Sequence, residues 1–217
     1  MAGADIVRLK DARRLAKGSE RAIYALPGAP DQLIKVMLPK YRRALDGVDP
    51  DTAKGRRRHA VAYALFFREE DAIARARAMA QARGIRSPLP DFLGYRDTDM
   101  GLGQVVEMIR DDAGAMAPSL ADQCAEGSLS ASQQSALDAF VAAIYDLHIV
   151  VHDAGPKNIV WDAAAARYVL VDGFGDRSAL PLKTWFKPLN DRRLDRAFAE
   201  CAQKAGLLWD AGARRLA

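Results

Sequence analysis

The chain has 217 residues and a mass of 23.7 kDa, half of its residues are hydrophobic, and its net charge is +4 with a pI near 9.1. This length can bury a core in one domain or in two modest ones, and the composition excludes a disordered or fibrous protein. No stretch approaches the roughly 20 apolar residues of a membrane span, and the first residues lack the apolar run of a secretory signal. We therefore expect a globular cytoplasmic protein without a membrane partner.

The first 36 residues consist of short apolar runs separated by turn residues. Gly18-Ser19 forms the first turn, residues 27–30 form the second, and the run Leu33-Ile34-Lys35-Val36 follows. This spacing predicts three antiparallel strands. Two further apolar runs, at 92–95 and 104–109, are separated by another turn and predict two more strands. The sequence therefore predicts an antiparallel sheet of five strands.

The segment 57–83, between the two groups of strands, is rich in alanine and contains neither glycine nor proline. Its apolar residues recur at helical spacing, which predicts one long helix. The densest positive cluster of the chain, Arg56-Arg57-Arg58, lies at the start of this segment. It is either a solvated helical turn or a patch for an anionic partner, and the absence of interleaved aromatic residues favours the solvated turn. We therefore do not expect a nucleic-acid partner.

The second half of the chain has a mainly helical pattern. Residues 111–114 are typical of a linker, and residues 130–147 predict an amphipathic helix with Ser130 or Ser132 as its N-cap. Two short apolar runs, at 159–161 and 168–171, predict a strand pair. The predicted fold class is therefore α+β, with a sheet and one long helix in residues 1–110 and a mainly helical part in residues 111–217.

Polar residues with a distinctive spacing surround this strand pair. His152-Asp153 precedes it, Asn158 comes five residues after Asp153, and Asp172-Gly173 follows the second run. Each fragment alone would be an ordinary turn, because Asp, Gly and Pro are common turn residues. The ordered set, however, resembles the catalytic and metal-binding loops of protein kinases, and the resemblance implies a two-lobed kinase-like fold.

The resemblance also implies a chemistry. A triphosphate repels an anionic nucleophile, so a carboxylate has to orient the acceptor hydroxyl while oxygen ligands hold the magnesium ion that bridges the phosphates. By this resemblance Asp153 is the general base, Asn158 and Asp172 are metal ligands, and the cofactors are ATP and Mg²⁺.

A lysine and a glutamate complete the set that the resemblance implies. Lys35 stands in the third strand, where kinases have a lysine that contacts the nucleotide phosphates. Glu69 and Glu70 of the long helix are candidate partners for it, and we select Glu70 because it lies three residues before Ile73 and four after Phe66. Taken alone, Lys35 is better explained as a solubility residue on an edge strand and Glu70 as an exposed helix charge, so the assignment depends on their order in the chain.

Two further nucleotide contacts are implied by position. Gly18 and Ser19 occupy the place of the glycine-rich phosphate loop, although an ordinary hairpin turn explains them equally well. Residues 104–109 resemble the last strand of a kinase sheet and the hinge after it. Backbone groups of Glu107 and Ile109 would there bind adenine, with an apolar edge strand as the alternative.

Among kinase-like proteins, the chain resembles the bacterial YrbL family of the PhoP regulatory network, most clearly in its C-terminal stretch 172–185. Gly155 stands where kinases place a lysine near the transferred phosphoryl group, and Lys157 is the nearest substitute. We therefore predict a magnesium- and ATP-dependent phosphotransferase with an unidentified acceptor, either a small molecule or a protein. The alternative is a pseudokinase-type module that binds nucleotide without transferring phosphate.

Overall fold

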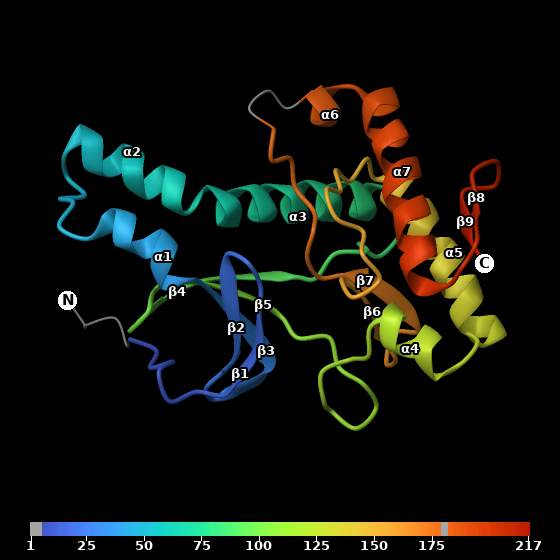
Figure 1. Cartoon of the computed structure of the whole chain (residues 1–217), viewed down its shortest axis with the longest axis horizontal. Helices are drawn as coiled ribbons and strands as arrows, with labels where there is room; N and C mark the ends of the chain where they lie inside the picture. The colour runs from blue at the N-terminus through green and yellow to red at the C-terminus, as the bar shows by residue number, and fades with distance from the viewer. Residues whose placement is uncertain (1–5, 179–181) are drawn as a thin grey trace. The chain divides into compact units, whose positions relative to one another are not determined.

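The computed structural model describes residues 6–178 and 182–217 (Figure 1). The chain divides into two compact units, of which the first contains the chain up to Phe67 together with Asp91–Met108. The second contains Arg68–Pro90 and Ile109–Ala217. The predicted boundary at residue 110 is close to the end of the first unit, but residues 68–90, which the sequence prediction assigned to the first half, group with the second unit.

The first unit contains the predicted antiparallel five-stranded sheet. The apolar runs and intervening turns of the sequence form its strands in the order β1-β2-β3-β5-β4, and each neighbouring pair is antiparallel. This confirms the α+β class. The strands are β1 Arg14–Lys17, β2 Arg21–Leu26, β3 Ala29–Met37, β4 Phe92–Thr98 and β5 Gly101–Glu107.

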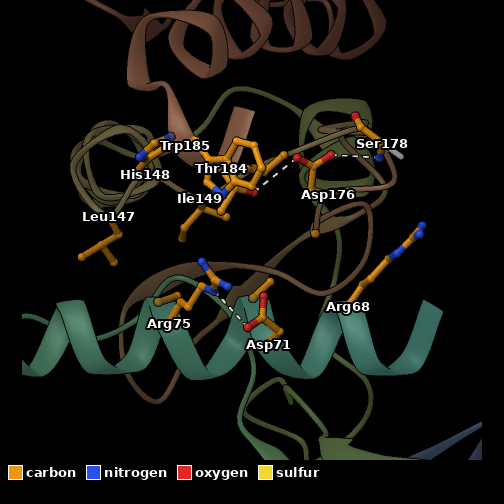
Figure 2. A pocket seen from close by; sticks show the side chains of 14 residues that line it. Arg68, Asp71, Arg75, Leu147, His148, Ile149, Asp176, Ser178, Thr184 and Trp185 are labelled. Carbon is orange, nitrogen blue, oxygen red and sulfur yellow. Dashed lines mark hydrogen bonds and ion pairs between the residues drawn. The ribbon is translucent and has the colours of Figure 1, made fainter. Parts of the chain in front are cut away.

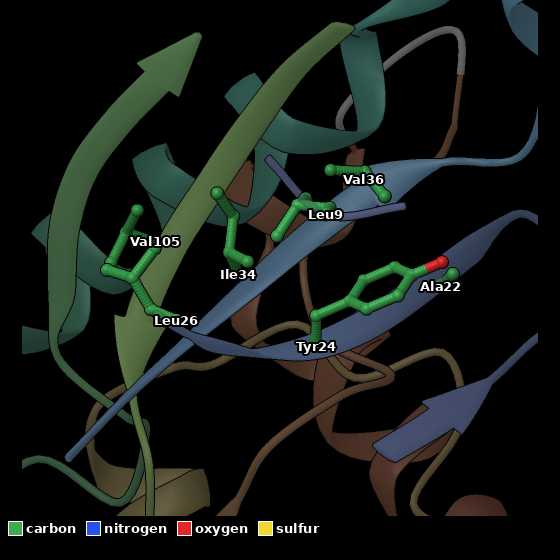
Figure 3. Packing of buried hydrophobic residues seen from close by; sticks show 7 residues of the cluster. All are labelled: Leu9, Ala22, Tyr24, Leu26, Ile34, Val36 and Val105. Atoms are coloured by element: carbon green, nitrogen blue, oxygen red, sulfur yellow. The ribbon is translucent and has the colours of Figure 1, made fainter. Parts of the chain in front are cut away.

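Side chains from β2, β3 and β5 build the core of this sheet (Figure 3). Ile34 is fully buried, and its register places the following residues, Lys35 and Val36, opposite Gln104 and Gly103 of β5. A Cβ atom at Gly103 would lie 2.5 Å from the Cδ1 atom of Ile34. Because residue 103 of β5 has no side chain, the side chain of Ile34 on β3 has room beside it.

Two helices replace the one long helix that the alanine-rich segment predicts. After the short helix α1 (Pro39–Arg42) and the 3₁₀ turn η1 (Arg43–Leu45), α2 spans Ala53–Ala62 and α3 spans Ala64–Ala82. Tyr63 separates α2 from α3 with φ −103° and ψ 8°. Its ring is buried against Phe66, and its hydroxyl accepts a 3.4 Å hydrogen bond from the Leu102 amide. Tertiary packing of this side chain thus interrupts a sequence that favours helix throughout.

The second unit is mainly helical, as predicted. Ser130, not Ser132, caps its central helix by accepting a hydrogen bond from the amide of Gln133. The predicted strand pair is present as an antiparallel hairpin. The elements are α4 Leu120–Glu126, α5 Ala131–Asp146, β6 Ile159–Asp162, β7 Arg167–Leu170, α6 Leu182–Trp185, α7 Lys187–Ala205, β8 Trp209–Asp210 and β9 Arg215–Leu216.

The apolar face of α5 forms the core of the second unit. Leu137, Val141 and Ile144 have no exposed surface, and Phe140 packs edge-on against Phe198 of α7. Phe198 in turn stacks on Trp209 at 5.5 Å, which fixes the hairpin β8–β9 against α7. Within the part of the chain that the structure describes, no helix is long and apolar enough to cross a bilayer.

Candidate active site

Two adjoining loops of the second unit carry the predicted catalytic and metal-binding residues. Val151 and Phe174 form an isolated antiparallel bridge, and the amide of Gly175 donates to the carbonyl of Val150 at 2.9 Å. The carbonyl of Gly173 accepts hydrogen bonds from the amides of His152 and Asp153, at 2.8 and 3.0 Å. The segment that carries Asp153 is therefore held directly against the segment that follows Asp172.

The loop from Asp153 to Asn158 is closed by its own polar groups. The Oδ1 atom of Asp153 accepts a 2.9 Å hydrogen bond from the amide of Gly155, and the carbonyl of Gly155 accepts a 2.8 Å bond from the amide of Asn158. The side-chain Nδ2 atom of Asn158 donates to the carbonyl of Asp153 at 3.4 Å. This contact turns the Nδ2 atom toward the loop and leaves the Oδ1 atom of Asn158 as the one suited to a cation.

Asp172 is joined to Asn158 through the main chain, because the amide of the preceding residue, Val171, donates to the carbonyl of Asn158 at 2.9 Å. The half-buried Asp172 carboxylate accepts a 2.7 Å hydrogen bond from the amide of Gly173. Gly173 has φ +86°, and a Cβ atom there would lie 1.9 Å from the carbonyl oxygen of Asp153. Only glycine permits this close approach of the two loops.

An amide oxygen and a carboxylate from adjoining loops suit a magnesium ion. Mg²⁺ prefers oxygen ligands and usually takes one or two carboxylates, completing its shell with waters and substrate phosphates. Asn158 and Asp172 provide such a set. Among residues 6–178 and 182–217, no group of three or more His, Cys, Asp or Glu side chains could hold a metal ion by itself. The donor set therefore fits a metal that binds together with phosphates.

Helix α7 supports the Asp153 loop in a way that the sequence did not reveal. Asn190, which has no exposed surface, donates from Nδ2 to the carbonyl of Ile149 at 3.0 Å. One turn further along, the Nη2 atom of Arg193 donates to the carbonyl of His152 at 2.9 Å. These two side chains hold both ends of the stretch that immediately precedes Asp153. No spacing signal could have identified them, because the contacts depend on how α7 packs.

His152 is in an environment that favours its neutral form. Burial lowers the pKa of its imidazole below the ordinary value, and the nearby guanidinium of Arg177 lowers it further. The carboxylates of Asp172 and Asp153 act in the opposite direction with smaller effect. The imidazole next to Asp153 is therefore held without charge at neutral pH.

The first unit contains the predicted phosphate turn. The amide of Gly18 donates to the carbonyl of Arg21 at 2.9 Å, which closes a turn with Ser19 at its exposed tip. A hollow of about 400 Å³ lies beside this turn and is lined by Lys17 and Lys40 as well as by Gly18 and Ser19. Two ammonium groups beside exposed backbone suit an anion such as a phosphate.

Lys35 is buried at the centre of the first unit's sheet. Its strand, β3, lies between β2 and β5, and the residue has 2% exposed surface. The alternative of a solubility residue on an edge strand is therefore wrong. A buried ammonium group is costly unless it is compensated, which is the environment expected for a functional lysine.

The burial argument that selected Glu70 is wrong, because Glu69 is the buried carboxylate of α3. Glu69 has no exposed surface, whereas Glu70 is half-buried. With 3.6 residues per turn, Glu69 lies about 25° from the mean direction of the buried stripe and Glu70 about 75°. The stripe consists of Phe66, Ile73, Ala76 and Ala80. Pairing of Lys35, in the first unit, with either glutamate stays a prediction.

Glu107 and Ile109 stand where the sequence predicts adenine contacts, but part of their main chain already has partners. The amide of Glu107 donates to the carbonyl of Asp91 at 2.9 Å, and the carbonyl of Ile109 accepts a 3.0 Å bond from the amide of Ala117. Their role in nucleotide binding stays a prediction.

The order of these elements defines the class of protein. A lysine in the third strand of an antiparallel sheet precedes a helix with a buried carboxylate. An Asp-x₄-Asn loop, a strand pair and Asp-Gly then follow, as in kinase-like proteins.

Solved structures to which the chain is similar are two crystal structures of the Mycobacterium tuberculosis PknI kinase domain, one of a single mutant and one of a double mutant. The single mutant has 16% identity and a TM-score of 0.47 over 87% of this chain and 71% of that chain. The double mutant has 17% identity and a TM-score of 0.48 over 85% and 70%.

Residues 7–206 match the model of the family described as PhoP regulatory network protein YrbL. The chain belongs to this family. It is 28% identical over 188 residues to the uncharacterized protein YrbL of Escherichia coli strain K12, a match that covers 84% of this chain and 80% of the relative. The uncharacterized protein YrbL of Shigella flexneri matches with the same identity and coverage.

Proposed function

We propose that the protein transfers a phosphoryl group from magnesium-bound ATP to an acceptor hydroxyl. The observation that carries this proposal is the main-chain connection of Asp153, Asn158 and Asp172 within two adjoining loops of one unit. An isolated turn would need no such main-chain links between the segments that carry these three residues.

Asp153 acts as the general base in this proposal. Its Oδ1 atom accepts a hydrogen bond from the Gly155 amide, which orients the carboxylate, and we assign acceptance of the acceptor's proton to the Oδ2 atom of this exposed residue. The support that α7 provides from Asn190 and Arg193 restrains the same stretch of main chain. Positioning of this kind is the main contribution that a protein makes to phosphoryl transfer.

Asn158 and Asp172 would hold the magnesium ion. When bound, the ion neutralises charge on the phosphates. In the first unit, Lys35 and the turn at Gly18 and Ser19 would contact the phosphates. In α3, the buried Glu69 replaces Glu70 as the carboxylate that we propose to be functional.

A second candidate function is a nucleotide-binding module without transfer, and the position of Lys157 favours it. The charge of this lysine acts on Asp122 of α4, whose pKa is lowered mainly by a hydrogen bond from Ser119 and to a smaller extent by Lys157. The charge of the nearest substitute for the kinase lysine thus contributes to the electrostatic environment of α4. Position 155 itself carries only glycine.

Thermal unfolding with ATP and Mg²⁺, separately and together, tests nucleotide binding. We expect the melting temperature of the wild type to rise most with both present, and the magnesium-dependent part of that rise to vanish in Asp172→Ala. Asp146→Ala, which removes an exposed carboxylate of the same unit, is the matched control and should respond like the wild type. An unchanged melting temperature in the wild type would refute the proposal.

Asp153→Asn separates the two candidate functions. If the protein is an enzyme, the variant should keep the magnesium-dependent stabilisation by ATP and lose release of ADP. If it is a binding module, neither the wild type nor the variant should release ADP above the buffer rate.

A further inference from the structure

The second unit contains a cavity of about 350 Å³ that is separate from the residues assigned to phosphoryl transfer (Figure 2). One wall is a face of α3, and the opposite wall is formed by Asp176, Ser178, Thr184 and Trp185. Asp153, Asn158 and Asp172 do not line it. The volume is at the lower end of the range for small-molecule sites.

The α3 wall combines charge with a small apolar floor. Arg68, Asp71, Ala72 and Arg75 follow the i, i+3, i+4, i+7 spacing of one helical face. Arg75 pairs with Asp71 through Nε and Oδ1 at 2.9 Å, and both side chains are about 60% exposed. Figure 2 shows the two side chains rising from the helix toward the opposite wall. Ala72 leaves room beside them.

The opposite wall contributes an aromatic surface and a carboxylate, both oxygens of which accept hydrogen bonds from the same wall. The Oδ1 atom of Asp176 accepts from the amide of Ser178 at 2.9 Å, and its Oδ2 atom accepts from the hydroxyl of Thr184 at 3.2 Å. Trp185 is 62% exposed. An indole that exposed at the edge of a cavity is available to pack against a ligand.

Hydrogen-bond capacity in the cavity favours an anion. A guanidinium has five N–H donors, and Arg75 uses its Nε donor on Asp71 while Arg68 makes one long contact with the carbonyl of Arg177 at 3.4 Å. On the acidic side, both oxygens of Asp176 and one of Asp71 accept bonds. The Nη groups of Arg75 therefore have donors that the contact with Asp71 does not use.

We propose that this cavity is a second ligand site, which takes a small aromatic anion. A carboxylate of the ligand would bind the two Nη groups of Arg75 as a charge-assisted pair. The aromatic ring would lie over Ala72 and against Trp185. The proposal does not depend on phosphoryl transfer.

Occupation of the site would connect two segments that carry residues of the candidate active site. Helix α3 carries Glu69, and the opposite wall begins at Asp176, four residues after Asp172. A ligand that contacts Arg75 and Trp185 at once restrains both segments. We therefore expect it to raise the stability of the second unit by mass action.

Isothermal titration with three naphthalene probes of similar size tests the charge preference. We expect 1-naphthoate to bind the wild type saturably, and neutral 1-naphthamide and cationic 1-naphthylmethylamine to bind at least about tenfold more weakly, because only the anion satisfies Arg75. Equal affinities for the three probes, or no binding of naphthoate at millimolar concentration, would overturn the proposal.

Three variants locate the site. Arg75→Gln removes the charge, Ala72→Phe fills the floor while keeping the charges, and Trp185→Ala removes the exposed wall; each should weaken naphthoate binding about 10- to 100-fold. Arg77→Gln, on an exposed position of α3 outside the cavity, is the control and should bind as the wild type does. If Arg75→Gln and Ala72→Phe both melt like the wild type and bind naphthoate normally, the anion binds elsewhere and the proposal fails.

Discussion

The loop at Asp153 and the turn at Gly18 are held in different ways. The Asp153 loop of the second unit is fixed by main-chain bonds to the distant residues Gly173 and Gly175 and by side chains of α7. The turn at Gly18 of the first unit is closed by a local bond to Arg21. The first arrangement requires segments far apart in sequence to meet, whereas the second needs only a hairpin. Substitutions in the two loops should therefore have different consequences.

The largest effect is expected from Asp153→Asn. Loss of a positioned general base lowers rates by about 10²- to 10⁴-fold, so ADP release should fall by that factor while folding is retained, because Asn is isosteric with Asp. Release of ADP from ATP under saturating magnesium measures the effect. A rate within twofold of the wild type would show that Asp153 is not the base.

Replacing glycine by alanine in each of the two loops should lower the free energy of unfolding by different amounts. Gly173→Ala places a Cβ atom 1.9 Å from the Asp153 carbonyl at φ +86°, and the combined clash and strain should cost about 3 kcal/mol of unfolding free energy. At Gly18 the nearest atom would be 3.8 Å away, so Gly18→Ala should change the free energy by less than about 0.5 kcal/mol. Urea unfolding of both variants checks this, and equal losses would contradict the comparison.

Asn190→Ala should weaken the support of the Asp153 loop from α7. It deletes a buried donor and leaves the carbonyl of Ile149 without that bond, which should cost about 2 kcal/mol. The exposed neighbour Arg192→Ala is the control, with an expected change within about 0.5 kcal/mol. Urea unfolding gives both values; a loss no larger than that of the control would mean that the bond contributes nothing to stability.

The smallest effect that we expect is a pH dependence of the free energy of unfolding that originates from His152. Burial and Arg177 depress the pKa of the folded imidazole, so the unfolded chain binds a proton first as the pH falls below about 6.5, and the folded state loses stability from there downward. The slope from one group cannot exceed about 1.4 kcal/mol per pH unit. Comparing urea unfolding of wild type and His152→Gln at pH 7.5 and 5.5 isolates it, and identical pH slopes would refute the assignment.

Local patterns predicted most of the fold. The turn residues and apolar runs defined the five strands, and the serine before the periodic segment defined the start of α5 at Ala131. The pair of short apolar runs predicted the β6–β7 hairpin. In each case the signal lies within a few residues of the element that it forms.

The sequence predictions failed where contacts between residues far apart in the sequence determine the structure. The break at Tyr63 comes from its contacts with Phe66 and Leu102, and helical propensity alone contains no sign of it. Spacing from two apolar residues could not separate Glu69 from Glu70, but the direction of the whole alanine-containing stripe would have favoured Glu69. The contacts of α7 with the Asp153 loop could not be predicted at all.

The meeting of Ile34 and Gly103 makes the sheet intolerant of change at one position. A Cβ atom at position 103 would lie 2.5 Å from the Cδ1 atom of Ile34, so the Ile34 side chain, which directly precedes Lys35 on β3, would have to shift. A library randomised at position 103 should therefore return glycine alone, and other residues should be accepted only when Ile34 is shortened in the same molecule. These two positions are expected to vary as a pair, with their combined volume held constant.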